Sequence, residues 1–338
     1  GKASAEEYRR MQIFLLLAAG CIAIDQTLLS IVILLVLLQG LYIAWKERDI
    51  PQLRIWPRRI KWIFLFLFAT GYISLHNPLV SETFSCTFNF FYVAGQYAAI
   101  VWLTTRFGNY FAGRGVFDKP QPYEEDLPFW EVFARQPFVI RMLRVLEWIA
   151  ILSVLIGIGQ HYFGGSTDMV WVDRNANPLL HNRIYSTWEN PNIFAGYLCV
   201  VAAYVMGYIS VEKNSRKRWR LFAFLLLVLL CEVFTFSRGF WLAMALELLL
   251  FVLFFYRKGL PYFFGVFLGG ITLAGPAVWQ RLETLRHLTV DSSAAMRVAY
   301  LDIAQAIVKD HPLGIGWYNY RYIFPEYDYY FNKMEYSQ

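Results

Sequence analysis

Charged side chains are scarce in this sequence. They make up 17% of its 338 residues, whereas soluble domains have about 25%. Hydrophobic residues account for 57%, and long apolar runs recur from Met11 to Trp279. Runs of this length and number are typical of chains that cross a bilayer several times. We therefore predict a polytopic membrane protein rather than a soluble globular domain.

Cysteines are also few, and none has the spacing of a metal site. They lie in or beside apolar segments, where free thiols pack as small hydrophobic groups: Cys21, Cys86, Cys199 and Cys231. The loops expected outside lack an Asp-x-Asp pair, and Asp168 with Asp173 would make a poor cation cage. We expect neither a metal nor a cofactor. No secretory cleavage site, internal repeat or low-complexity tract is evident.

The apolar runs predict an all-α protein with about nine transmembrane helices. Their expected bounds are 11–24, 27–45, 61–77, 86–106, 143–163, 191–211, 219–236, 239–256 and 260–279. The first run is shorter than the roughly 20 residues that a bilayer needs, so we expect it to form a tight hairpin with the second.

Positive charge alternates between the connections of these runs. With the N-terminus inside, the inner segments hold 22 of the 31 Lys and Arg residues, and the short outer connections hold only Arg174, Arg183 and Arg238. The positive-inside rule thus accounts for the net charge of +6 without a nucleic-acid partner. By the same rule, KNSRKRWR (213–220) is predicted to be a cytoplasmic loop, and its charges are interpreted as a topology signal rather than a lipid-specific site.

The apolar runs are expected to form a transmembrane bundle over 1–279. One polar segment is a long loop within this bundle, and a second follows it. The cytoplasmic loop 107–142 contains four prolines and an acidic run, and WEVFARQPF (130–138) suits a helix on the membrane surface. The outer segment 280–338 contains an expected helix that starts at Asp291, Ser292 or Ser293 and stops before Pro312. Its apolar face is predicted to comprise Met296, Tyr300, Ile303, Ala304 and Ile307. A turn at GIG (314–316) then leads into a tyrosine-rich stretch.

Three arginines from distant parts of the chain share the predicted outer face: Arg183, Arg238 and Arg297. Each has a structural alternative, because Arg183 could snorkel or pair with Glu189, Arg238 could be a turn residue, and Arg297 could be a solvated helix residue. Together they favour a site for an anionic lipid head group such as a polyprenyl pyrophosphate, since guanidinium forks match phosphate oxygens.

The entry to the run at 191 is unusually polar for a membrane helix. In ENPN, Asn190 suits a helix cap before Pro191, and Asn192 can donate hydrogen bonds at the boundary. Glycosyl transfer to a hydroxyl also needs a base, and His181 is a weak candidate because it lies two residues from Arg183.

Three blocks resemble the O-antigen ligase/polymerase superfamily in the same order: NRIYSTWENPNIFAGYL (182–198), TFSRGFWLA (235–243) and MRVAYLDIAQAIVKDHPLGIGWYNYRYIFPEY (296–327). The resemblance covers roughly 181–327. It implies a metal-independent glycosyltransferase of the bacterial inner membrane, active at the periplasmic face. The donor would be a glycan on undecaprenyl pyrophosphate. The acceptor would be lipid A-core, another repeat unit or a protein.

The resemblance also implies site roles. Arg183 and Arg297 are expected to act in catalysis by binding the pyrophosphate, and Arg238, Asn192 and Tyr320 are expected to contribute to substrate binding. Partners would include membrane lipids but no nucleic acid. Ligase-type relatives carry a base histidine soon after the last block. It is absent here, so the chain is expected to be an incomplete and inactive piece.

Two other classes stay open at this point. A transporter would place ionisable groups near the bilayer midplane, where this chain has only Glu147, Glu232 and Glu247. A structural scaffold would not need clustered outer arginines.

Overall fold

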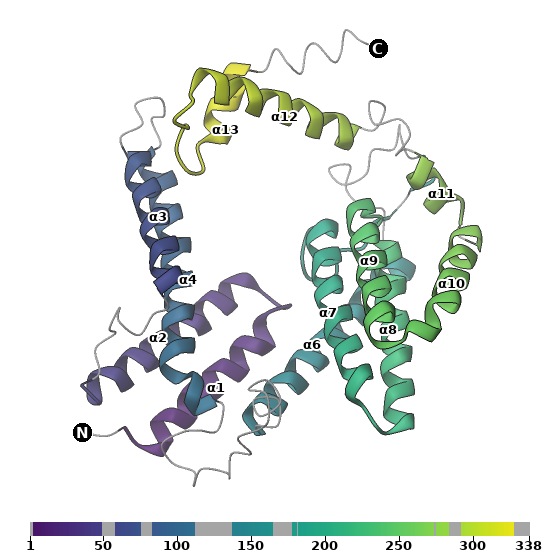
Figure 1. Cartoon of the computed structure of the whole chain (residues 1–338), viewed down its shortest axis with the longest axis horizontal. Coiled ribbons are helices and arrows are strands. Elements are labelled where there is room, and N and C mark those ends of the chain that lie inside the picture. The colour runs from purple at the N-terminus through teal and green to yellow at the C-terminus, as the bar shows by residue number, and fades with distance from the viewer. Residues whose placement is uncertain are drawn as a thin grey trace. The chain divides into compact units, whose positions relative to one another are not determined.

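The computed structural model describes residues 3–48, 58–75, 83–111, 137–164, 178–180, 182–273, 275–283 and 292–327 (Figure 1). All regular elements within these ranges are helices, which confirms the predicted all-α fold. Three of them are long and apolar enough to cross a membrane: α2 (Gln26–Lys46), α7 (Pro191–Val211) and α9 (Arg238–Phe255). At 1.5 Å per residue they measure roughly 27–32 Å, close to the hydrocarbon thickness of a bilayer.

The other predicted spans also coincide with helices, to within a few residues at most ends. These are α1 (Ala5–Cys21), α3 (Arg58–Leu75), α4 (Thr83–Phe111), α6 (Pro137–Phe163) and α8 (Ser215–Phe234). The prediction of one continuous span over 260–279 was wrong. That segment forms α10 (Leu260–Leu273) and α11 (Pro276–Glu283). Pro276 cannot continue a helix and disfavours helical backbone at the residue before it.

The chain divides into two compact units. Unit 1 contains residues 1–19, 27–144 and 296–338, and unit 2 contains residues 20–26 and 145–295. The predicted cytoplasmic loop 107–142 is entered by α4, which continues to Phe111, and is left by α6, which begins at Pro137. Residues 112–136, and with them most of the expected surface helix 130–138, lie outside the described residues.

In unit 1, α1, α2 and α4 share one apolar core. Its fully buried side chains include Tyr8, Met11, Ile43 and Phe107. Gly40 permits the close approach of α2 to α4, because a Cβ atom there would lie 2.7 Å from the side chain of Leu103.

The segment after residue 280, which is predicted to lie outside, forms the expected helix, α12 (Ser292–Asp310), most of which belongs to unit 1. Its buried face is centred on Ala299, Ile303 and Ile307, which corrects the prediction: Met296 and Tyr300 are exposed. This face packs on α13 (Tyr320–Ile323) and the 3₁₀ turn η3 (Phe324–Tyr327). Gly314 and Gly316 both have φ of 89°, so glycine is needed where the chain turns back, as GIG predicted.

The loop after this turn rests on α3 and α4. Trp317 stacks on Phe90 with ring centroids 4.8 Å apart, and its indole N–H donates to Thr70 Oγ1 over 2.9 Å. Thr70 lies near the C-terminal end of α3 and Phe90 near the N-terminal end of α4. The topology prediction places both of these helix ends on the same side as the outer segment, so the contact agrees with it.

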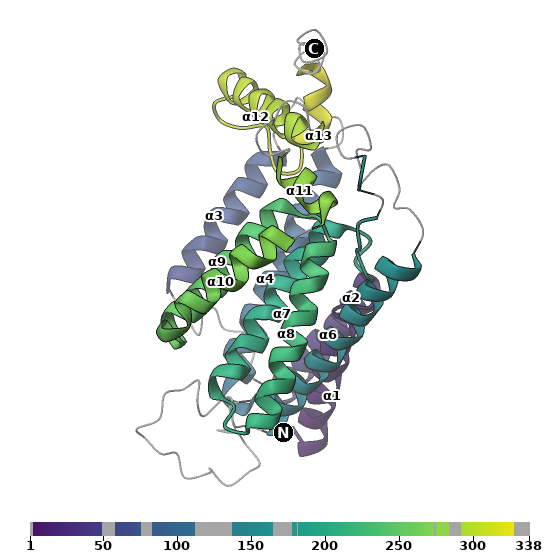
Figure 2. The ribbon, with the colours of Figure 1, turned by 90° about the vertical axis from the view of Figure 1, so that its right-hand side faces the viewer.

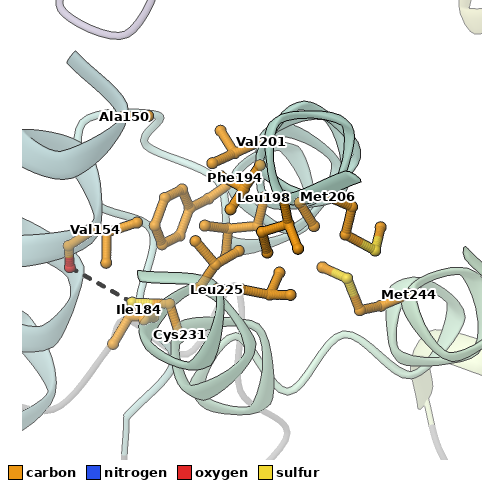
Figure 3. Close-up of a cluster of buried hydrophobic side chains, with 14 residues drawn as sticks. Ala150, Val154, Ile184, Phe194, Leu198, Val201, Met206, Leu225, Cys231 and Met244 are labelled. Carbon is orange, nitrogen blue, oxygen red and sulfur yellow. Dashed lines mark hydrogen bonds between the residues drawn. The ribbon is translucent and has the colours of Figure 1, made fainter. Parts of the chain in front are cut away.

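Unit 2 is built around α7, which packs on α8 and α9 (Figures 1 and 2). The α7 side chains Phe194, Leu198, Val205 and Ile209 are fully buried. They belong to one cluster with residues of α6, α8 and α9. Figure 3 shows Phe194 and Leu198 in this cluster, where Cys231 Sγ donates to the carbonyl of Val154 over 3.5 Å. The cluster holds together the helices whose ends form the candidate site.

Close packing of α6 on this cluster depends on Gly157. A Cβ atom there would lie 3.0 Å from the Phe194 ring and 3.3 Å from Ile184, whereas a Cβ on Gly159 would meet nothing within 4 Å. We expect Gly157→Leu to destabilise the protein by about 1–3 kcal/mol through overpacking. Gly159→Leu, on the same helix, should leave the unfolding temperature in detergent almost unchanged. Equal effects of the two changes would contradict this packing.

Glu7 provides a pH-dependent contribution to the stability of unit 1. The Glu7 carboxylate accepts a hydrogen bond from Lys46 Nζ over 2.6 Å and another from the Ser4 N–H over 2.6 Å. Together these two donors lower the pKa of Glu7 to about 2 from 4.5. A lowered folded-state pKa stabilises the protein above pH 4.5, and this contribution disappears as pH falls towards 2.

The expected result is a lower unfolding temperature for Glu7→Gln than for the wild type at neutral pH, with a difference that shrinks below pH 4.5. Glu6→Gln is the matched control, because Glu6 forms only an exposed pair with Arg10 on the same helix. A difference between wild type and Glu7→Gln that does not change with pH would refute the assignment.

Candidate functional site

The polar stretch before α7 is held in place by the last turns of α6. Gln160 Oε1 accepts hydrogen bonds from the Tyr185 N–H over 3.1 Å and the Ser186 N–H over 2.7 Å, and its amide donates to the Ser186 carbonyl. The Gln160 carbonyl accepts from Asn182 Nδ2 over 2.9 Å. Ser186 has φ of 53°, and its hydroxyl donates a hydrogen bond to the carbonyl of Ser153 in α6. These contacts fix the backbone on both sides of Arg183.

Arg183 is buried, with 5% of its surface exposed. Its Nε donates to the Thr235 carbonyl over 2.8 Å, and its Nη2 donates to Asn192 Oδ1 over 2.9 Å and Ser237 Oγ over 3.0 Å. Ser237 Oγ also donates to Asn192 Oδ1 over 2.9 Å. The alternative of a snorkelling side chain is therefore wrong, because the guanidinium points into the protein.

These contacts join three segments that are far apart in the sequence. Arg183 lies before α7, Asn192 lies in its first turn, and Thr235 and Ser237 form the turn between α8 and α9. The acceptors are neutral, so they satisfy N–H groups of the guanidinium while its positive charge persists. The result is a fixed cation at one end of three packed helices.

The entry to α7 confirms the expected cap. Asn190 has extended backbone and its side chain accepts from the Asn192 N–H over 2.8 Å, with Pro191 at the first helical position. The cap fixes the direction in which α7 begins. Asn192 is thereby placed with its side-chain oxygen towards Arg183 and Ser237.

The turn between α8 and α9 is tight and held from several sides. Phe236 has φ of 52°, and the buried Arg281 of α11 donates from Nε to its carbonyl over 3.3 Å. Trp241 Nε1 donates to the carbonyl of Glu232 over 2.9 Å. Arg238 follows as the first residue of α9 and is half-buried. Arg183, Arg238 and Arg281 are thus all attached to one turn of unit 2.

The remaining predicted site residues belong to unit 1. Arg297 is exposed near the start of α12. Tyr320 is half-buried and donates from its hydroxyl to the Tyr300 carbonyl over 2.8 Å, and burial, with a smaller effect of Tyr300, raises the pKa of Tyr320. Convergence of Arg297 with the arginines of unit 2 stays a prediction. His181, the weak candidate base, lies outside the described residues.

Sequence reasoning missed Arg281, Ser237 and Gln160. Arg281 was detectable, because it is a cation that directly follows the last apolar run. Ser237 was detectable only as the neighbour of Arg238. Nothing in the sequence distinguishes Gln160 as the residue that shapes the 182–186 backbone. In the part of the chain that the structure describes, no three His, Cys, Asp or Glu side chains are grouped to hold a metal.

Comparison with known proteins finds a match to a protein-family model. The family model of the O-antigen ligases matches residues 222–337, from the middle of α8 to beyond η3. No curated protein and no solved structure matches the chain significantly. The matched region contains Arg238, Arg281, Arg297 and Tyr320. It excludes Arg183 and Asn192, which are nevertheless bound to Ser237 within it.

Loss of the guanidinium at 183 should loosen the turn between α8 and α9. Hydrogen bonds from a charged donor contribute about 1.5–3 kcal/mol each, and Arg183→Met removes three of them. We expect backbone amides of 235–241 to exchange with solvent at least about tenfold faster, as measured by hydrogen–deuterium exchange. Arg218→Met, an exposed arginine at the other end of α8, is the control. Unchanged exchange in Arg183→Met would show that Arg183 does not hold the turn.

Proposed function

We propose that this chain, which matches the O-antigen ligase family over residues 222–337, moves a glycan from undecaprenyl pyrophosphate to an acceptor hydroxyl. The family supports membrane glycosyl transfer in general, with a lipid-linked glycan as donor. The finer reaction, at the outer face of the inner membrane, is our proposal. The observation that carries it is the buried guanidinium of Arg183 bound to Ser237, next to Arg238.

The reaction requires an anion to be stabilised as it leaves. The acceptor oxygen forms a bond to the anomeric carbon of the donor sugar, and the bond from that carbon to the pyrophosphate oxygen breaks. The hydroxyl proton passes to a base, and the lipid pyrophosphate departs with the electron pair. Fixed cations that face the departing oxygens lower the energy of the transition state, because they need not reorganise during the reaction.

The arginines have different parts in this proposal. Arg183 is a positioning residue, because three of its hydrogen bonds go to the protein and fix the turn that carries Arg238. Arg238 is half-buried beside this turn and is the proposed phosphate ligand of unit 2. Arg297 is proposed as a second phosphate ligand. Asn192 and Tyr320 are proposed to contact the donor.

The same chemistry fits three acceptors. Lipid A-core would make the protein a ligase, a second repeat unit would make it a polymerase, and a protein hydroxyl would make it an oligosaccharyltransferase. We favour lipid A-core ligation, and the acceptor used in a transfer assay distinguishes the three. A transporter is disfavoured, because α7, α8 and α9 run without a break and the arginines lie at their ends.

Replacing Arg297 with lysine should abolish most of the activity. A point charge cannot reproduce a bidentate contact on phosphate, and a lost charged hydrogen bond of about 3 kcal/mol in the transition state corresponds to a roughly 100-fold lower rate. Arg183→Lys should also lower the rate, because lysine cannot keep all three hydrogen bonds that fix the turn carrying Arg238. The measurement is transfer of a pyrophosphate-linked glycan by the full-length protein in membrane vesicles. The control is Lys217→Ala at the other end of α8, which should retain wild-type turnover.

Transfer should also proceed at full rate in the presence of EDTA, because the proposal assigns the stabilisation of the leaving group to arginines alone. The assay is the same vesicle transfer, with chelator added before the donor. Wild-type rates in Arg297→Lys would remove that residue from the mechanism. Abolition by EDTA, reversed by added Mg²⁺, would show that a metal ion does the work assigned here to guanidinium groups.

A further inference from the structure

The end of α8 opposite the arginine site carries a cavity with a basic and aromatic lining. It has a volume of about 290 Å³ and is lined by Arg218, Trp219, Phe222 and Tyr256. The first three residues lie on α8, and Tyr256 ends α9, where its N–H donates to the Val252 carbonyl over 2.8 Å. Two helices of unit 2 therefore build this cavity.

Cations are numerous at the two helix ends that build the cavity, the start of α8 and the segment after α9. They are all exposed, and among them Arg218 lines the cavity: Lys213, Arg216, Lys217, Arg218, Arg220, Arg257 and Lys258. The salt bridges among the residues that the structure describes both lie elsewhere, between Arg10 and Glu6 and between Lys46 and Glu7. The nearby Glu212 accepts from the Asn214 N–H over 2.8 Å.

This accumulation of positive charge is unfavourable for α8 itself. The N-terminus of a helix carries a partial positive charge, which repels basic side chains in the first turn. Asn214 caps the helix by accepting from the N–H groups of Arg216 and Lys217, which does not neutralise any side-chain charge. An external anion close to these cations would lower the electrostatic energy of this end of the protein.

The aromatic residues indicate where that anion would be located. Trp219 is 71% exposed and lies 5.9 Å from Phe222 between ring centroids, and Tyr256 lies 5.5 Å from Phe251. Exposed Trp and Tyr side chains at the end of a membrane helix favour the level of the lipid head groups. A guanidinium and three aromatic rings around one hollow suit a phosphate with an apolar body attached.

We propose that this cavity binds an anionic phospholipid, with Arg218 on the phosphate and Trp219, Phe222 and Tyr256 against the glycerol and upper acyl chains. The positive-inside rule explains why Lys and Arg are frequent at this end of α8, and for that rule Lys217 counts as much as Arg218. It does not account for a hollow with one arginine and three aromatic residues in its wall. The structure thus assigns a second anion site to unit 2, at the far end of α8 from Arg183.

The test measures retained lipid on the purified chain. The protein is reconstituted in vesicles of phosphatidylglycerol and phosphatidylcholine, and native mass spectrometry counts the lipid that remains bound after release. We expect wild type to retain phosphatidylglycerol in preference to phosphatidylcholine. Arg218→Gln should lower this retention about tenfold, and Trp219→Ala should lower it severalfold without any change in charge. Lys217→Gln removes the same charge from the same helix outside the cavity and should have a clearly smaller effect.

Two results would overturn the proposal. Equal losses in Arg218→Gln and Lys217→Gln, together with wild-type retention in Trp219→Ala, would mean that the charges act only as a diffuse surface. Displacement of phosphatidylglycerol by inorganic phosphate, with equal binding of phosphate in phosphatidylcholine vesicles, would identify a site for a soluble anion instead. All three variants change exposed side chains, and equal unfolding temperatures would establish that each is folded.

Discussion

The hydrogen bonds of one buried guanidinium, that of Arg183, organise one end of unit 2. They connect the loop before α7, the first turn of α7 and the turn between α8 and α9. A buried arginine needs acceptors for its five N–H groups, and backbone carbonyls become available where a helix ends. The end of α8 supplies such a carbonyl at Thr235. The positions of Asn192, Ser237 and Arg238 all follow from this contact.

The membrane explains why the site lies at helix ends. Within the hydrocarbon, backbone polar groups must be satisfied inside the helix, and charged side chains are costly. The middle of α7 is accordingly packed with apolar side chains such as Leu198 and Val201 (Figure 3). Polar turns, caps and arginines are tolerated only where the helices emerge. The cluster of buried side chains fixes the spacing of those ends, so it controls the geometry of a site to which it contributes no polar group.

The two ends of α8 use the same residue type in different ways. At one end Arg183 and Arg281 are buried and bound to backbone carbonyls, so their positions are fixed. At the other end Arg216, Arg218 and Arg220 are exposed, and Arg218 lines a hollow together with aromatic residues. Fixed cations suit a reaction in which charge develops at one point. Exposed cations suit a lipid head group that exchanges with the bilayer.

The sequence alone determined the all-α class, the positions of nearly all helices and the cap at Asn190, because these depend on apolar length and local backbone chemistry. It also determined the likeness to O-antigen ligases, which rests on ordered motifs. The tertiary structure decided which groups meet. The contact between Arg183 and Thr235 joins residues 52 positions apart, and no periodicity encodes it. The buried face of α12 includes Ala299 instead of the predicted Met296 and Tyr300. The reason is that α12 packs against a short helix that follows the glycine turn. Helical spacing defines several possible faces, and only the packing of a second element selects one of them.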